Sequence, residues 1–78
     1  MPTVLRWNGY RFYFFSNEGT EPPHIHIDKA GSTAKFWLED AMAARNLGFT
    51  AREIAELSGK VREQQQSFLE AWRGYFGR

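Results

Sequence analysis

The chain has no cysteine, little net charge and no long apolar run. Without cysteine it can form no disulfide, and it has no thiolate to act as a metal ligand or nucleophile. No segment approaches the roughly 20 apolar residues of a membrane helix. The opening residues, MPTVLRWNG, lack the apolar stretch of a signal peptide. These absences predict a cytoplasmic protein that does not enter a membrane.

The excess of one sign of charge is also small, because 10 Lys and Arg residues are nearly balanced by 9 Asp and Glu residues. A net charge of +1 does not by itself predict nucleic-acid binding, so any basic patch must be local. Aromatic residues, by contrast, are abundant, with 3 Trp, 3 Tyr and 7 Phe among 78 residues. Each aromatic side chain can bury roughly 150–250 Å². Since a chain this short supports one core, we predict a single domain over residues 1–78.

Residues 3–16, TVLRWNGYRFYFFS, have the pattern of a β-hairpin. Asn8-Gly9 favours a two-residue type I′ turn, because both positions tolerate positive φ. This turn predicts the pairs Trp7 with Tyr10, Arg6 with Arg11, Leu5 with Phe12, and Val4 with Tyr13. Alternation along the strands then predicts one face made of Leu5, Trp7, Tyr10, Phe12 and Phe14, and an opposite face made of Val4, Arg6, Arg11, Tyr13 and Phe15.

A second hairpin is predicted from residue 24 onward, turning at Ala30-Gly31 and returning as STAKFWLE. Ile25 and Ile27 lie on its apolar side. One register keeps the apolar residues of both strands together, and a slip of one residue would separate them. In that register His24 faces Trp37, His26 faces Lys35, and Asp28 faces Thr33.

The second half of the chain is predicted to be helical, after an extended or irregular stretch at residues 40–49. Thr50 and Glu53 have the spacing of a capping box, which marks the start of a helix. Apolar residues then follow at helical spacing: Ile54, Leu57, Val61, Phe68, Trp72 and Tyr75. We expect Ser58-Gly59 to bend or split this helix, and residues 64–66, all Gln, to lie on its solvent-exposed surface. The predicted fold class is α+β: an antiparallel sheet of two hairpins with a C-terminal helix or helix pair packed on one face.

If helices cover the apolar face, the other face of the sheet is left open to water. It is expected to carry Arg6, Arg11, Tyr13, His24, His26, Asp28, Lys35 and Trp37. Directly opposed arginines destabilise a strand pair unless an anion lies between them, which favours phosphate. In an RNA-binding interpretation, Arg6, Arg11, Tyr13 and Trp37 hold phosphates and stack on bases. His24, His26, Lys35 and Glu21 are then the candidate catalytic residues of a ribonuclease.

Two other interpretations of this face remain open. His24, His26 and Asp28 could bind a metal ion, but the cationic Lys35 opposite His26 argues against it, so we predict neither metal nor cofactor. Alternatively, the face is simply solvated or is a protein interface. The partner would then be a cognate small protein or a second copy of the chain, forming a homodimer. The sequence also leaves open whether the protein is an enzyme.

Nearly the whole chain resembles a small bacterial family, the domain of unknown function family 4160. The similarity is carried by PTVLRWNGYRFYFFSNEGTEPPHIHI, AKFWLE and FLEAWRGYF, in that order and spacing. Its recurring motifs fall at residues 17–19, 21–26 and 35–38, and Glu39-Asp40 replaces a usual Glu-Pro. The resemblance implies a component of a toxin–antitoxin pair with a partner encoded nearby, and it brings no established catalytic residues.

Overall fold

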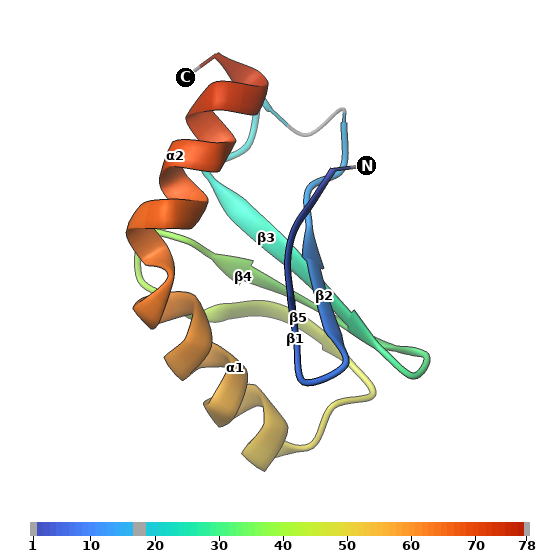
Figure 1. Ribbon diagram of the computed structural model, residues 1–78. Coiled ribbons are helices and arrows are strands. Elements are labelled where there is room, and N and C mark those ends of the chain that lie inside the picture. Colours follow the sequence, from blue (N-terminus) through green and yellow to red (C-terminus); the bar gives the residue numbers. More distant parts are fainter. Residues whose placement is uncertain (1, 17–18, 78) are drawn as a thin grey trace.

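The computed structural model describes residues 2–16 and 19–77 and contains five strands and two helices (Figure 1). Residues 17 and 18, which begin the recurring motif at 17–19, lie outside the described part. The elements are β1 (Thr3–Trp7), β2 (Tyr10–Tyr13), β3 (His24–Lys29), β4 (Ser32–Trp37), β5 (Ala43–Leu47), α1 (Ala51–Glu63) and α2 (Gln65–Phe76).

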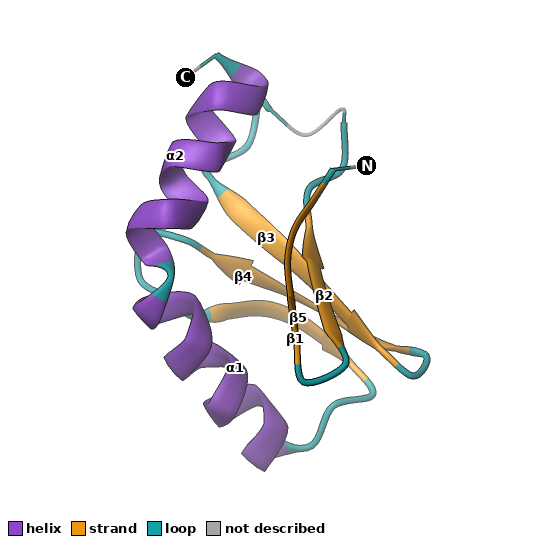
Figure 2. Cartoon of the chain, in the orientation of Figure 1, coloured by secondary structure: helices purple, strands orange, loops and turns teal. Residues whose placement is uncertain are grey.

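The strands form one sheet in the order β1-β2-β3-β4-β5, and every neighbouring pair is antiparallel. Both helices lie on the same side of this sheet, as a second layer (Figure 2). The Cα radius of gyration is 11.4 Å, close to the value of about 11.5 Å for a compact fold of this length. The predicted α+β class, with a helix pair on one face of an antiparallel sheet, is confirmed.

The first hairpin turns at Asn8 and Gly9, whose φ angles are 51° and 82°. Three of the four predicted pairs are present. The pairing of Val4 with Tyr13 is wrong, because a register shift between Thr3 and Leu5 brings Thr3 opposite Tyr13. This bulge turns Val4 toward the core, against which it packs, so Val4 does not belong to the polar face.

The second hairpin has the predicted register along its whole length. Ala30 and Gly31 turn with φ angles of 50° and 86°, the left-handed values that a tight turn requires. Ile25 and Ile27 are fully buried. Keeping the apolar residues on one side was therefore sufficient to define how β3 and β4 pair.

Residues 40–49 are partly extended and partly irregular, as expected, but the extended part forms a fifth strand that the two-hairpin prediction did not include. β5 pairs with β4 and occupies an edge of the sheet. Ahead of it, the Asp40 carboxylate accepts a hydrogen bond from the Met42 backbone N–H at 3.0 Å, so Asp40 closes a turn.

The predicted capping box starts α1: Thr50 Oγ1 accepts from Glu53 N at 3.1 Å, and Glu53 Oε1 accepts from Thr50 N at 2.9 Å. The helix breaks at Gln64, not at the predicted Ser58-Gly59. Gln65 does not lie on an exposed surface as expected. It is half-buried, and its side-chain amide donates to the carbonyls of Leu38 and Glu39 at 2.6 and 2.7 Å. These bonds fasten the helix junction to the turn after β4.

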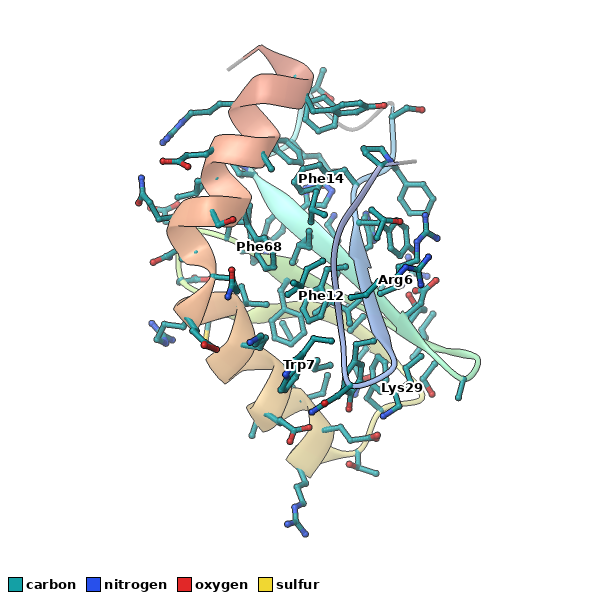
Figure 3. All side chains as sticks on the ribbon, viewed as in Figure 1. Arg6, Trp7, Phe12, Phe14, Lys29 and Phe68 are labelled. Atoms are coloured by element: carbon teal, nitrogen blue, oxygen red, sulfur yellow. The ribbon has the colours of Figure 1, made fainter. Side chains whose placement is uncertain are left out.

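Aromatic side chains fill the space between the two layers (Figure 3). The ring of Phe12 lies 5.6 Å from that of Phe68, and the ring of Phe14 lies 5.3 Å from that of Trp72, edge to face. Within residues 2–16 and 19–77, neither helix is long and apolar enough to cross a membrane.

Candidate binding pocket on the open sheet face

The face of the sheet opposite the helices contains a pocket of about 410 Å³. Its aromatic and ionisable lining residues are Tyr13, Phe15, Glu21, His26, Lys35 and Arg45. Thr33, Ala34 and Leu47 complete the lining. Four predicted site residues, Tyr13, Glu21, His26 and Lys35, are thus brought together. They come from β2, β3, β4 and the segment that precedes β3.

His26 forms part of the pocket wall and is held between aromatic rings. Its ring stacks on that of Tyr13 at 5.5 Å and meets the edge of Phe15 at 4.4 Å. The residue is only 9% exposed, so a narrow part of the imidazole faces the pocket. On β4, Lys35 is its cross-strand partner.

A hydrogen-bond network fixes the Tyr13 ring in the wall. The Tyr13 hydroxyl donates to the Asp28 carboxylate at 3.0 Å, and the Thr33 hydroxyl donates to the same carboxylate at 2.6 Å. The Arg11 guanidinium lies 4.4 Å from the centre of the Tyr13 ring. Burial raises the pKa of Tyr13 above its usual value of 10, and the hydrogen bond to Asp28 and the charge of Asp28 add to this effect. Tyr13, which is only 4% exposed, therefore lines the pocket, while its hydroxyl is bound to Asp28.

Two cations lie next to each other along the pocket. Lys35 Nζ forms an ion pair with Glu21 Oε1 at 2.6 Å and lies 4.7 Å from the centre of the Trp37 ring. Arg45, on β5, is the direct cross-strand partner of Lys35. This pair of positive charges can bind an anion.

The prediction that both histidines point to water is wrong for His24, which is 0% exposed. Its ring lies 5.0 Å from that of Trp72 on α2 and 5.9 Å from that of Trp37. Its Nδ1 lies 2.9 Å from the Pro22 carbonyl oxygen, and because a carbonyl can only accept, Nδ1 donates. The prediction assumed that the helices cover only the apolar face, but α2 extends to the beginning of β3 (Figure 1). In this structure the imidazole of His24 is therefore not open to solvent or to the pocket.

Three predicted nucleic-acid-binding residues, Arg6, Arg11 and Trp37, do not line the pocket. Arg11 lies opposite Asp28 on β3, and its Nε donates to Thr3 Oγ1 at 2.7 Å. A negative charge of the protein itself is therefore beside Arg11, which removes the argument that the opposed arginines require an external anion. Arg6 is exposed on the edge strand β1 and points away from the helices (Figure 3).

The alternative metal site is not formed. Within residues 2–16 and 19–77, no three His, Cys, Asp or Glu side chains lie close enough together to hold a metal ion. The proposed ligands His24, His26 and Asp28 fail as a set because His24 is bound to the Pro22 carbonyl and Asp28 accepts from Tyr13 and Thr33.

Sequence reasoning missed Phe15, Arg45 and Leu47 as lining residues. Phe15 was placed on the correct face but given no role. Arg45 and Leu47 were missed because residues 40–49 were not assigned to the sheet. A signal was available: Asp40 favours a turn and Gly48 ends the segment, so the short stretch between them could return along β4.

Comparison with known proteins gives one match. A family model described as Domain of unknown function (DUF4160) matches residues 9–73, which include every lining residue of the pocket. No curated protein and no solved structure matches the chain significantly. Because the match spans most of the 78 residues, the chain belongs to the Domain of unknown function (DUF4160) family.

Proposed function

We propose that this protein is a small toxin–antitoxin-type component that binds single-stranded RNA in the pocket on its open sheet face. One observation carries the proposal: within about 410 Å³ the pocket combines two cations, two aromatic rings and one imidazole. RNA is a ligand that uses all three kinds of group, since it offers phosphates, bases and a cleavable backbone.

The roles follow from the positions of the side chains. Arg45 holds a phosphate, and Lys35, which is paired with Glu21, lies beside it. Tyr13 and Phe15 form an apolar wall for an unstacked base, a contact worth roughly 1–3 kcal/mol per base. His26 lies between that wall and Lys35, where an imidazole can transfer a proton during strand cleavage. Of the predicted catalytic residues, His26, Lys35 and Glu21 line this pocket, and we assign the role of acid or base to His26.

Binding is tested with a fluorescently labelled single-stranded RNA by anisotropy at several salt concentrations. Arg45→Gln should weaken binding and lower the slope of log K against log salt by about 0.7. Lys35→Gln should have a smaller effect, because Lys35 is already paired with Glu21. Arg52→Gln removes the same charge from an exposed position on α1, outside the pocket, and serves as the matched control. If Arg52→Gln weakens binding as much as Arg45→Gln does, the pocket is not the RNA site.

Cleavage is tested separately from binding. His26→Ala should abolish RNA cleavage, and growth inhibition on induction, while binding falls only in part because both cations remain. Unchanged cleavage or unchanged toxicity of a folded His26→Ala protein would remove the catalytic role. RNA binding without cleavage by the wild-type protein would make the pocket a binding site alone.

A second candidate function is supported by the edge strand β5, whose five residues are all exposed. Such an edge offers unpaired backbone groups to an added strand, so the protein could be a non-enzymatic interaction module for a cognate small protein or a second copy of itself. Size-exclusion chromatography with and without the neighbouring gene product separates the two candidates. Stable co-elution of protein, together with no RNA affinity, would favour this second function.

A further inference from the structure

The charges around the pocket do not cancel. Glu21 is the only carboxylate among the described residues that line it, and it pairs with Lys35 at 2.6 Å. The Arg45 guanidinium forms no hydrogen bond or ion pair within residues 2–16 and 19–77, although its backbone pairs with β4. Among the Lys, Arg, Asp and Glu side chains of the described lining, Glu21 thus compensates Lys35 and leaves Arg45 uncompensated.

The position of Glu21 follows from the backbone on either side of it. The Pro22 carbonyl accepts from His24 Nδ1 at 2.9 Å, and the Pro23 carbonyl accepts from Leu38 N at 3.0 Å. These bonds anchor the segment after Glu21 to the end of β3 and to the residue that follows β4. The backbone after Glu21 is therefore fixed, and the ion pair with Lys35 places the carboxylate, whose side chain is 43% exposed.

We infer that Glu21 makes the pocket select an internal phosphodiester of RNA and reject a terminal phosphate, an inference that rests on the proposed RNA-binding function. A phosphodiester has one negative charge, which matches the single uncompensated cation. A phosphate monoester carries about −1.5 to −2 at neutral pH, so its second charge would meet the Glu21 carboxylate. Like charges at such short range repel, and the neighbouring Lys35 is already neutralised by Glu21.

This selection implies that the protein contacts RNA along the strand and not at its end. A phosphodiester has a nucleoside on both sides, and the Tyr13 and Phe15 rings lie in the same pocket as Lys35 and Arg45. One base next to the bound phosphate can therefore reach the aromatic wall, while the strand continues out of the open pocket.

The test compares two short single-stranded RNAs of identical sequence, one with a 5′-hydroxyl and one with a 5′-phosphate, in the same anisotropy assay. The wild-type protein should bind the 5′-phosphorylated strand no more tightly than the 5′-hydroxyl strand. In Glu21→Gln the added phosphate should improve binding by about three- to tenfold, because the repelling charge is gone and Lys35 becomes available.

Glu63→Gln is the matched control, because Glu63 also forms an exposed ion pair, with Lys60 at 3.1 Å, but on α1 away from the pocket. It should leave the ratio of the two affinities unchanged. A wild-type preference for the 5′-phosphorylated strand, or equal ratios in Glu21→Gln and Glu63→Gln, would overturn the inference while RNA binding stands. If the wild-type protein binds neither strand, the proposed function itself fails.

Discussion

The two histidines on β3 lie two residues apart but in different environments. At the beginning of the strand, His24 is enclosed by Trp72, Trp37 and the Pro22 carbonyl. Two residues further along the strand, His26 belongs to the wall of an open pocket. Their rings still touch, with centroids 5.1 Å apart. The boundary between the closed end of this sheet face and its open pocket therefore falls between these two rings.

The comparison shows that alternation along a strand determines on which side a residue lies, but not what covers it. The tryptophan that reaches His24 is almost 50 residues away in sequence, and its position depends on how α2 is set after the break at Gln64. A histidine can be buried here because its Nδ1–H is bound to a carbonyl. We therefore expect His24 to act in stability and His26 in function.

The closed end depends most on Trp72, so Trp72→Ala should have the largest effect. Trp72 is 1% exposed, and its ring lies 5.3 Å from Phe14, 4.2 Å from Phe76 and 5.0 Å from His24. Removing a buried side chain of this size costs roughly 3–5 kcal/mol, a large share of the stability of a small domain. The free energy of unfolding in urea, measured by circular dichroism, tests this.

Arg73→Ala, at the exposed neighbouring position, should change that free energy by less than about 0.5 kcal/mol. Equal losses at residues 72 and 73 would mean that α2 does not pack through Trp72, and the explanation for the burial of His24 would be wrong.

Alanine variants of the two histidines should show different defects, one in stability and one in RNA cleavage. His24→Ala removes the bond to the Pro22 carbonyl and leaves a cavity where the fully buried imidazole packs against Trp72, which costs roughly 1–3 kcal/mol of stability. His26→Ala should lose less stability but abolish RNA cleavage. Urea unfolding measures the stability of both variants. RNA cleavage is measured on the folded variants without denaturant. His24→Asn, whose amide can donate from nearly the same position as Nδ1, should recover part of the stability, and failure to recover any would mean that the bond to Pro22 is unimportant.

Much of the fold was predictable from local patterns, because the determinants were close in sequence. Asn8-Gly9 defined the first turn, the two isoleucines defined the pairing of β3 with β4, and Thr50 with Glu53 defined the start of α1. The pairing of Val4 failed because a bulge is not visible in an alternating pattern.

The site was predictable only in part, for a related reason. His26 and Lys35 were identified because the register of the second hairpin pairs them, and Tyr13 because alternation places it on the same face. The pairing of β2 with β3, which brings Tyr13 beside His26, was not predicted. Arg45 was missed because recognising β5 requires knowing that a short polar segment pairs with β4. The burial of His24 was missed because it depends on contacts with a distant helix, which no local pattern specifies.

Adding a single methyl group to the segment before β3 should also disturb the packing of the end of α2. A Cβ at Gly19 would lie 2.6 Å from Phe76 Cδ1, closer than packed atoms allow. Gly19→Ala should therefore push this segment away from α2 and destabilise the protein by roughly 1–3 kcal/mol. Gly59→Ala is its counterpart, because a Cβ at Gly59 meets nothing within 4 Å in the interior of α1. That change should stabilise the protein by roughly 0.5–1 kcal/mol in thermal unfolding. A stabilising Gly19→Ala would contradict the close packing at the closed end.

The smallest effect concerns the open pocket and appears only at alkaline pH. The pKa of Tyr13 is raised by burial and by Asp28, and the pKa of Tyr10 is raised by burial and by Glu53 and Glu56. An unfolded chain loses these protons near pH 10, whereas the folded protein retains them, so the folded state binds more protons above pH 10. Below pH 10 these two tyrosines should therefore add no pH dependence to the free energy of unfolding. Their contribution should be lost as pH rises through their folded pKa values. Urea unfolding from pH 8 to 11 should show a shallower fall for Tyr13→Phe than for the wild type, since only Tyr10 then contributes. An identical fall in both proteins would mean that the hydrogen bond between Tyr13 and Asp28 does not hold the pocket wall in place.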